Sequence, residues 1–215
     1  LHLPEFTMLE WYEVGADYRD LMNRCEDLLL FLARELGRGT TVDLGEGRQL
    51  SLENPWGRIP LAEAFERHAS CSLEEALKED RFDEVLTFEV EPNLGRKTPA
   101  FLYDYPAALG ALARKKPGDP TLAERFELYL DGLELANGFS ELTDADEQRR
   151  RFEKEEQRRA EQWLKAYHKP VKFLAALPHL PESAGIALGI DRLVMLFCGT
   201  RTIDDVVAFT PELLK

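Results

Sequence analysis

Apolar residues recur every three or four positions between residues 17 and 36, the spacing that places them on one side of an α-helix. These positions are Tyr18, Leu21, Met22, Cys25, Leu28, Leu29, Leu32 and Leu36. Gly37 follows the last of them and predicts the end of the helix. A second long helix is predicted at residues 144–168, where charges of both signs dominate and apolar residues are sparse. The first helix is therefore amphipathic, whereas the second presents a solvated, ion-paired face.

Most of the remaining pattern predicts strands and short helices. Strands are expected at residues 5–14, 41–44, 49–52, 99–105 and 184–190, and residues 124–142 predict a long β segment that Gly132 and Asn137-Gly138 interrupt. Residues 61–90 predict short helices, one of which begins at a capping box formed by Ser72 and Glu75. The chain is expected to finish with a helix at 191–197, a short helix at 202–206 and a strand up to Phe209. Strands interrupted by helices, without strict βαβ alternation, indicate an α+β fold with a mainly antiparallel sheet.

Composition narrows the classes of function. The 215 residues are 44% hydrophobic and 31% charged, which fits a soluble globular domain. A net charge of −13 disfavours nucleic acids and anionic membranes as partners. No apolar run approaches the ~20 residues that a membrane span needs. Three scattered cysteines without a Cys-x-x-Cys motif fit a reducing cytoplasm, and four scattered histidines form no zinc-binding pattern.

The segment from Phe6 to Tyr12 contains the first group of candidate site residues. Alternation along a strand places Phe6, Glu10 and Tyr12 on one face. A carboxylate beside a tyrosine suits an ammonium group, and an aromatic side chain further along can stack on a nucleobase. The alternative is an ordinary amphipathic strand with Glu10 at its solvated margin.

A second group surrounds two glutamates that are seven residues apart, Glu134 and Glu141. This odd spacing places them on opposite faces of an unbroken strand. Asn137 and Gly138 predict a bulge or turn that brings both to one side. Paired carboxylates then form a site for Mg²⁺ with the phosphates of a nucleotide. A hairpin with two exposed glutamates is the alternative.

A third group lies where a strand of small residues enters a helix through Gly189. Glycines let the backbone approach a ligand closely, and Asp191 is the predicted N-cap of the helix. Arg192, in the first helical turn, can contact a phosphate or stack on a purine. The alternative is a buried strand packed against a helix, with Arg192 in a structural ion pair.

Taken in order, the three groups resemble the catalytic core of class II lysyl-tRNA synthetases. Residues 6–12 resemble the second half of class II motif 2, residues 134–141 the metal and amino-acid segment, and residues 185–192 motif 3. Within that group the chain is most similar to the truncated paralogues that attach lysine or β-lysine to elongation factor P. The segments behind this choice are Val90–Gly95, Asp104–Ala107, Gly132–Phe139, Glu141–Ala145 and Gly185–Arg192. The resemblance implies one catalytic domain over residues 1–215, with helices flanking a mainly antiparallel sheet.

The resemblance also implies a role for each site residue. The ATP-binding residues would be Phe6, Glu134, Leu135, Gly189 and Arg192, with Phe6 stacked on adenine. The residues that bind the lysine-like substrate would be Glu10, Tyr12, Asn137, Phe139, Glu141 and Ala187. Glu134 and Glu141 would hold Mg²⁺, and Glu134 and Arg192 would serve the chemistry.

The implied activity is that of an ATP-dependent ligase with ATP and Mg²⁺ as cofactors. It would activate lysine or β-lysine as an adenylate and transfer it to a lysine of elongation factor P, in the cytoplasm. Neither tRNA nor a membrane is an expected partner. Two other functions stay open: a fragment of a lysyl-tRNA synthetase that charges tRNA, and a non-catalytic paralogue that binds amino acid or nucleotide.

Three features depart from the family pattern. Leu3 stands where the family usually has asparagine, which puts one nucleotide contact in question. Ala187 stands where lysyl-tRNA synthetases usually have glycine, and one methyl group at a pocket wall can change which amino acid fits. Motif 1, which builds the family's homodimer interface, and the first half of motif 2 are expected upstream of Leu1.

Overall fold

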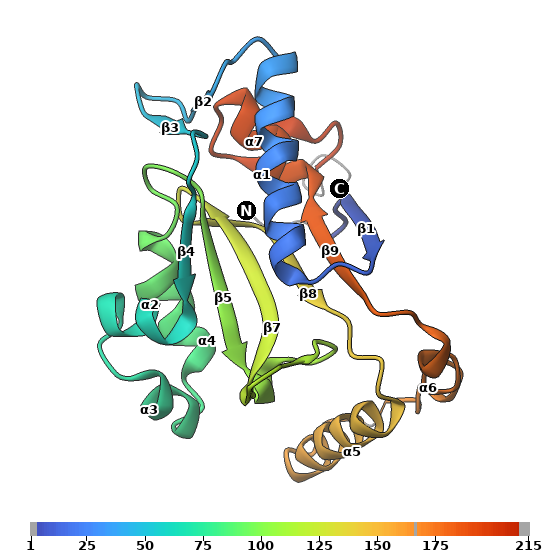
Figure 1. Cartoon of the computed structure of the whole chain (residues 1–215). Helices are drawn as coiled ribbons and strands as arrows, with labels where there is room; N and C mark the ends of the chain where they lie inside the picture. Colours follow the sequence, from blue (N-terminus) through green and yellow to red (C-terminus); the bar gives the residue numbers. More distant parts are fainter. Residues whose placement is uncertain (1–3, 166, 211–215) are drawn as a thin grey trace.

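A seven-stranded sheet is the framework of the fold, in the order β1-β9-β8-β7-β5-β4 with β6 paired to β7 (Figure 1). Its strands are β1 (Met8–Val14), β4 (Gly57–Pro60), β5 (Ala100–Pro106), β6 (Lys115–Lys116), β7 (Asp119–Leu130), β8 (Leu133–Ser140) and β9 (Ser183–Gly189). Only β4 and β5 pair in parallel among the residues that this computed structural model describes, 4–165 and 167–210. The prediction of an α+β fold with a mainly antiparallel sheet is confirmed.

Helices surround this sheet, and two short strands form a ribbon of their own. The helices are α1 (Tyr18–Glu35), α2 (Leu61–His68), α3 (Leu73–Lys78), α4 (Phe82–Val85), α5 (Ala145–Glu161), α6 (Val171–Ala176) and α7 (Ile190–Cys198). The ribbon consists of β2 (Thr41–Asp43) and β3 (Gln49–Ser51). Single turns are η1 (Leu86–Val90), η2 (Glu91–Asn93), η3 (Ala107–Leu109), η4 (Leu177–His179) and η5 (Ile203–Val206). No helix in the described part of the chain is both long and apolar enough to cross a membrane.

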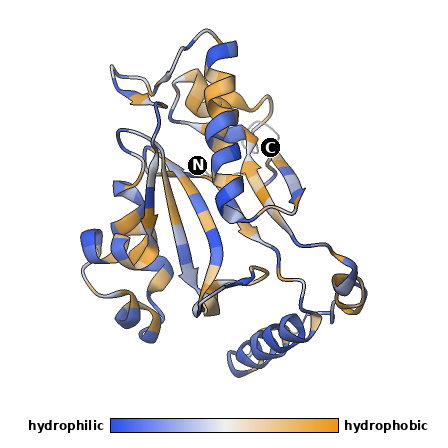
Figure 2. Ribbon diagram, viewed as in Figure 1, coloured by the Kyte–Doolittle hydropathy of each residue, from blue (hydrophilic) through white to orange (hydrophobic). Residues whose placement is uncertain are grey.

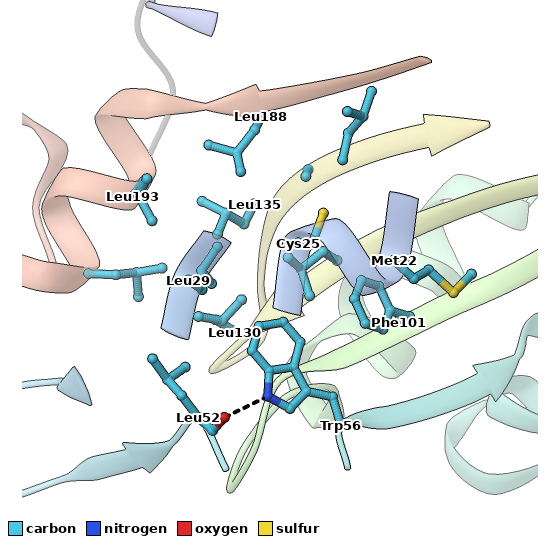
Figure 3. Close-up of a cluster of buried hydrophobic side chains, with 14 of the residues drawn as sticks. Met22, Cys25, Leu29, Leu52, Trp56, Phe101, Leu130, Leu135, Leu188 and Leu193 are labelled. Carbon is cyan, nitrogen blue, oxygen red and sulfur yellow. Dashed lines mark hydrogen bonds between the residues drawn. The ribbon is translucent and has the colours of Figure 1, made fainter. Parts of the chain in front are cut away.

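Helix α1 covers one face of the sheet and closes the larger hydrophobic core. Its N-cap is Asp17, whose carboxylate accepts hydrogen bonds from the backbone N–H groups of Arg19 and Asp20. The predicted apolar positions of α1 are buried, apart from the half-buried Leu28 and Leu32 and the exposed Leu36. Figure 3 shows the resulting cluster, in which the indole of Trp56 donates to the carbonyl of Leu52 (3.0 Å). The helix therefore fixes this face by burial of its apolar stripe.

The opposite face of the sheet is covered only in part. Helices α2, α3 and α4 form a second hydrophobic cluster with Leu102 of β5 and Tyr129 of β7. Leu102 pairs with Glu127, which pairs with Asn137 of β8, and paired residues point to the same face. The half of this face formed by β8, β9 and β1 carries polar and exposed side chains instead. This open half holds the candidate site.

The C-terminal third of the chain differs from the prediction in three places. Helix α5 ends at Glu161 rather than at 168, and it lies beside the unpredicted helix α6 at one end of the molecule (Figure 1). Figure 2 shows α5 as mostly hydrophilic, in agreement with its predicted solvated face. The short helix near 202–206 is confirmed as η5. The prediction of a strand up to Phe209 is wrong, because none of the described strands pairs with this segment.

Candidate functional site

Strands β1, β9 and β8 place the predicted residues in rows across the open face. The two central rows are Tyr12–Gly185–Phe139 and Glu10–Ala187–Asn137. Because directly paired residues share a face, each row presents its side chains to the same space. The middle strand contributes only glycine and alanine to these rows. The floor between β1 and β8 is therefore low enough to admit a ligand.

Two pockets adjoin on this face. The first pocket has a volume of about 370 Å³ and is lined by Glu10, Tyr12, Gly110, Ala111, Leu112, Arg125, Asn137, Phe139, Glu141, Gly185, Ile186 and Ala187. The second pocket has a volume of about 290 Å³ and is lined by Phe6, Thr7, Met8, Glu134, Leu135, Ala136, Asn137, Ala187, Gly189, Asp191, Arg192 and Ile203. Asn137 and Ala187 line both, so ligands in the two pockets would meet at these residues.

The first pocket has a negative electrostatic character. Glu10 and Glu141 both line it, while its only arginine, Arg125, forms an ion pair with Glu127 (2.6 Å). Burial raises the pKa of the Glu141 carboxyl to about 7, and no hydrogen bond or ion pair to this carboxylate occurs within the described ranges. Burial and the two glutamates also raise the pKa of Tyr12. Such a pocket suits a ligand with ammonium groups.

The second pocket combines an arginine, a carboxylate and an exposed aromatic ring. Arg192 of α7 donates from Nη1 to the carbonyl oxygen of Glu134 (2.6 Å) and lies 3.6 Å from its Oε2 atom. Burial and the nearby Glu127 raise the pKa of Glu134, although Arg192 opposes this shift. Phe6 is 65% exposed and lines the same pocket. A planar base beside a phosphate chain matches this arrangement.

The prediction that Asp191 caps helix α7 was wrong. Gly189 occupies the N-cap position, and Asp191 lies in the first turn. Its Oδ2 atom accepts a hydrogen bond from the backbone N–H of Thr7 (2.7 Å), and the N–H of Ile190 donates to the Thr7 carbonyl (2.9 Å). A tertiary contact has thus replaced the local cap. It ties the segment that carries Phe6 to the start of the helix that carries Arg192.

A β-bulge aligns Glu134 of β8 with Glu141, which directly follows this strand, but not where the sequence predicts it. Asn137 and Gly138 continue the ladder with β7 and β9, and the register shifts at Leu135, which has no direct partner on β7. Leu135 and Ala136 both enter the core, where Figure 3 shows Leu135 near Leu188. One extra residue converts the odd spacing into an even one. Glu134 and Glu141 therefore share the open face.

The structure does not bring these two glutamates together around one ion. Glu141 lines the first pocket and Glu134 the second. Six strand steps at ~3.3 Å each separate them by roughly 20 Å, far beyond the reach of a shared metal ion. The shared Mg²⁺ site expected from paired carboxylates is therefore not supported, because facing the same side does not shorten the distance along the strand.

The sequence reasoning missed Glu127, a buried carboxylate that organises the site. Its Oε1 accepts from Arg125 (2.6 Å) and Asn137 (3.1 Å), and its Oε2 from the hydroxyls of Tyr105 (2.6 Å) and Tyr129 (2.7 Å). Glu127 thereby orients the amide of Asn137 between the two pockets. A two-residue turn at 131–132, with positive φ at both residues, joins β7 to β8. This Asp-Gly signal could have placed Glu127 across from the β8 site residues.

Glu134 is the group that best fits a divalent cation. No cluster of three or more His, Cys, Asp or Glu side chains close enough to ligate an ion occurs within the described residues. Mg²⁺, however, often takes one or two carboxylates and completes its shell with phosphate oxygens and water. Burial and the negative charges of Glu127 and Glu91 raise the pKa of Glu134, and a bound cation would offset these charges. The donor set fits a metal that arrives with a phosphate chain.

Comparison with known proteins places the chain in a family. A family model described as tRNA synthetases class II (D, K and N) matches residues 1–212. The chain belongs to this class II synthetase family. Three relatives carry the name elongation factor P–(R)-beta-lysine ligase, from Pectobacterium carotovorum (44% identical over 218 residues), Vibrio cholerae (42% over 218) and Vibrio vulnificus (39% over 223). The matches cover 97–98% of this chain but 66% of each relative, so the chain spans about two thirds of their length.

The structure places every predicted ATP-binding and substrate-binding residue in the lining of the two adjoining pockets. All predicted ATP-binding residues line the second pocket, namely Phe6, Glu134, Leu135, Gly189 and Arg192. All predicted substrate residues line the first, namely Glu10, Tyr12, Asn137, Phe139, Glu141 and Ala187. Leu3 and the segment expected upstream of Leu1 lie outside the described residues. The roles of these residues stay predictions.

Proposed function

We propose that the protein is an ATP-dependent ligase that activates lysine or β-lysine and transfers it to a lysine side chain of elongation factor P. The observation that carries this proposal is the junction of the two pockets at Asn137 and Ala187. An amino acid in the first pocket and ATP in the second would meet there. The names of the relatives and their identity over nearly the whole chain support the choice of substrates.

In the first step the substrate carboxylate attacks the α-phosphorus of ATP. A bond forms between the carboxylate oxygen and that phosphorus, the bond to the β-phosphate bridging oxygen breaks, and pyrophosphate leaves. Positioning and charge neutralisation supply most of the catalysis. Phe6 would hold the adenine, and Arg192 would face the phosphates. Glu134 would hold Mg²⁺, which supplies a positive charge for the phosphates when bound.

Two carboxylates in the first pocket account for a diamino acid as substrate. Glu10 and Glu141 lie at separate places, on β1 and at the end of β8, and both line the same space. Lysine and β-lysine each carry two ammonium groups, so the pocket can neutralise both. The methyl group of Ala187 projects into both pockets, close to where the reacting carboxylate would lie. We propose it as the residue that helps to set the choice between lysine and β-lysine.

In the second step an amine of the acceptor attacks the carbonyl carbon of the adenylate. The C–N bond forms, AMP leaves, and the amine loses a proton. We propose a lysine of elongation factor P as the acceptor rather than tRNA. The open half of the sheet face leaves room for a side chain to approach.

The site of action proposed for this reaction is the cytoplasm. Cys25, Cys71 and Cys198 are all free thiols. Burial raises the pKa of the Cys25 thiol to about 12, so it serves as a small apolar residue in the core. Unpaired cysteines of this kind support a reducing compartment.

A label-transfer experiment tests the function directly. The full-length gene product is incubated with ATP and labelled lysine or β-lysine, with elongation factor P and lysine tRNA present together. We expect label on elongation factor P, and the preferred amino acid identifies the natural substrate. Label on tRNA would instead identify a lysyl-tRNA synthetase. Nucleotide binding without label on either acceptor would identify a non-catalytic paralogue.

A further inference from the structure

One wall of the first pocket is a stretch of loop backbone. Gly110, Ala111 and Leu112 line the pocket and lie between η3 and β6. Ala111 has a φ of 44°, in the left-handed region that a residue with a Cβ atom adopts only when its surroundings hold it there. The shape of this wall therefore depends on the contacts made outside the pocket.

The main contact comes from helix α5, which lines neither pocket. Nη1 of Arg151 donates to the carbonyl oxygens of Ala111 (2.9 Å) and Ala113 (2.8 Å). Hydrogen bonds from a charged guanidinium are stronger than hydrogen bonds from a neutral donor. The two bonds therefore fix the orientation of both peptide groups. Arg151 thus holds the loop at its left-handed residue, Ala111, and at Ala113, two residues further on.

Backbone hydrogen bonds connect the clamped wall to the end of β8. The N–H of Ala113 donates to the carbonyl of Gly110 (2.6 Å), and the N–H of Leu142 donates to the carbonyl of Leu112 (3.0 Å). Ala113 also forms a bridge with Glu141, the carboxylate of the first pocket. A shift of this loop would therefore move the backbone that lines the first pocket. It would also move Glu141, the residue that precedes Leu142.

Arg151 is itself held in place. Its side chain is 15% exposed, and its Nε atom donates to Oε1 of Glu147 (3.2 Å) one turn earlier on α5. Glu147 also pairs with Lys115 (2.8 Å) and Arg150 (3.0 Å), and these partners lower its pKa to about 2. The carboxylate is ionised throughout the working pH range. The loop that Arg151 holds is also tightly packed against β7, because a Cβ atom added to Gly110 would lie 2.8 Å from the Cβ atom of Ala123.

We propose that Arg151 is a positioning residue for amino-acid recognition, which sets the wall of the first pocket by holding the carbonyls of Ala111 and Ala113. This inference rests on the proposed function, since it assigns the first pocket to the amino acid. The planar guanidinium reaches two carbonyls and a carboxylate at once, whereas a lysine ammonium cannot reproduce that fork. None of these residues lines the second pocket, so we expect the clamp to affect the binding of the amino acid more than that of ATP.

The adjacent arginine provides a matched control. Arg150 also pairs with Glu147, but its side chain is 63% exposed and the structure shows no bond from it to the wall. In the full-length protein, amino-acid-dependent ATP–pyrophosphate exchange gives separate KM values for amino acid and ATP. We expect Arg151→Lys to raise the amino-acid KM about tenfold, the effect of weakening one charge-assisted hydrogen bond. The ATP KM should change less than about twofold, and Arg150→Lys should match the wild type.

Amide hydrogen exchange provides a readout that does not depend on catalysis. The amides of Ala113 and Leu142 should exchange faster in Arg151→Lys than in Arg150→Lys, because both donate to carbonyls of the wall. Equal amino-acid KM values together with equal exchange rates in the two variants would overturn the inference. A wild-type protein without amino-acid-dependent activity would contradict the proposed function, and the hydrogen-exchange comparison would then still decide whether Arg151 holds the wall.

Discussion

At the scale of single residues, we expect the charge of Glu141 to govern binding in the first pocket. Its carboxyl has a pKa of about 7, and only the ionised form attracts an ammonium group. We therefore expect the KM for lysine to fall as pH rises from about 6 to 8. Glu141→Gln should raise that KM about 10- to 100-fold, as expected for losing a charged hydrogen bond, and should remove the pH dependence. Pyrophosphate exchange across this pH range measures the KM for lysine and its pH dependence. If Glu141→Gln keeps the pH dependence, a group other than Glu141 causes it.

The same group makes the ligand-free fold sensitive to pH. Since the folded-state pKa of Glu141 lies above its ordinary value of 4.5, ionisation opposes folding. Its penalty grows as pH rises from about 4.5 to 7 and is complete above 7. Glu141→Gln should therefore raise the Tm more at pH 8 than at pH 5, by a few degrees at most for a partly exposed site. Thermal unfolding at the two pH values measures the difference, and a variant destabilised at pH 8 would contradict it.

In the second pocket, we expect the negative charge of Glu134 to hold Mg²⁺. Its carboxylate is only partly buried and its pKa is raised by burial, so Glu134→Gln should fold normally and raise the Tm by a few degrees at most. Losing the negative charge should remove the Mg²⁺ ligand and slow pyrophosphate exchange by at least about 100-fold. Normal exchange by the folded variant would exclude Glu134 as the metal ligand.

At the scale of the element, strand β9 serves each pocket with a different glycine. A Cβ atom on Gly185 would lie 2.5 Å from Oε1 of Glu141 and 2.7 Å from the ring of Tyr12, whereas one on Gly189 would meet nothing closer than 3.6 Å. Gly185→Ala should therefore displace two substrate residues and raise the amino-acid KM about tenfold or more. Gly189→Ala should fold normally and raise the ATP KM instead. If both variants raise the KM of the same substrate, the assignment of the first pocket to the amino acid and the second to ATP is contradicted.

At the scale of the whole molecule, the two pockets share Asn137 and Ala187, and we expect them to bind one continuous ligand. A ligand that binds the folded state stabilises it by mass action, and joining two ligands avoids the entropy cost of holding the second. A non-reactive analogue of lysyl-adenylate should therefore raise the Tm more than lysine and ATP added together at the same concentrations. Thermal shifts measure this. An analogue no better than the mixture would show that the pockets do not bind one continuous molecule.

Local patterns in the sequence determined much of the fold and pointed to the candidate residues that line the two pockets. The three-to-four periodicity of α1 and the alternation in β1 depend on neighbours within a few positions, so they can be read without a partner. The distribution of site residues among three segments likewise follows from short motifs. Even the shared face of Glu134 and Glu141 was predicted, although for the wrong reason.

What only the tertiary structure decided were the contacts between segments far apart in the chain. The bulge at Leu135 depends on how β8 packs into the core, and Glu127 became central only because Tyr105, Tyr129 and Asn137 converge on it. The separation of Glu134 from Glu141 and the clamp of Arg151 on a distant loop are of the same kind. The physical reason is that backbone periodicity sets which way a side chain points, whereas sheet register and loop packing set what it meets.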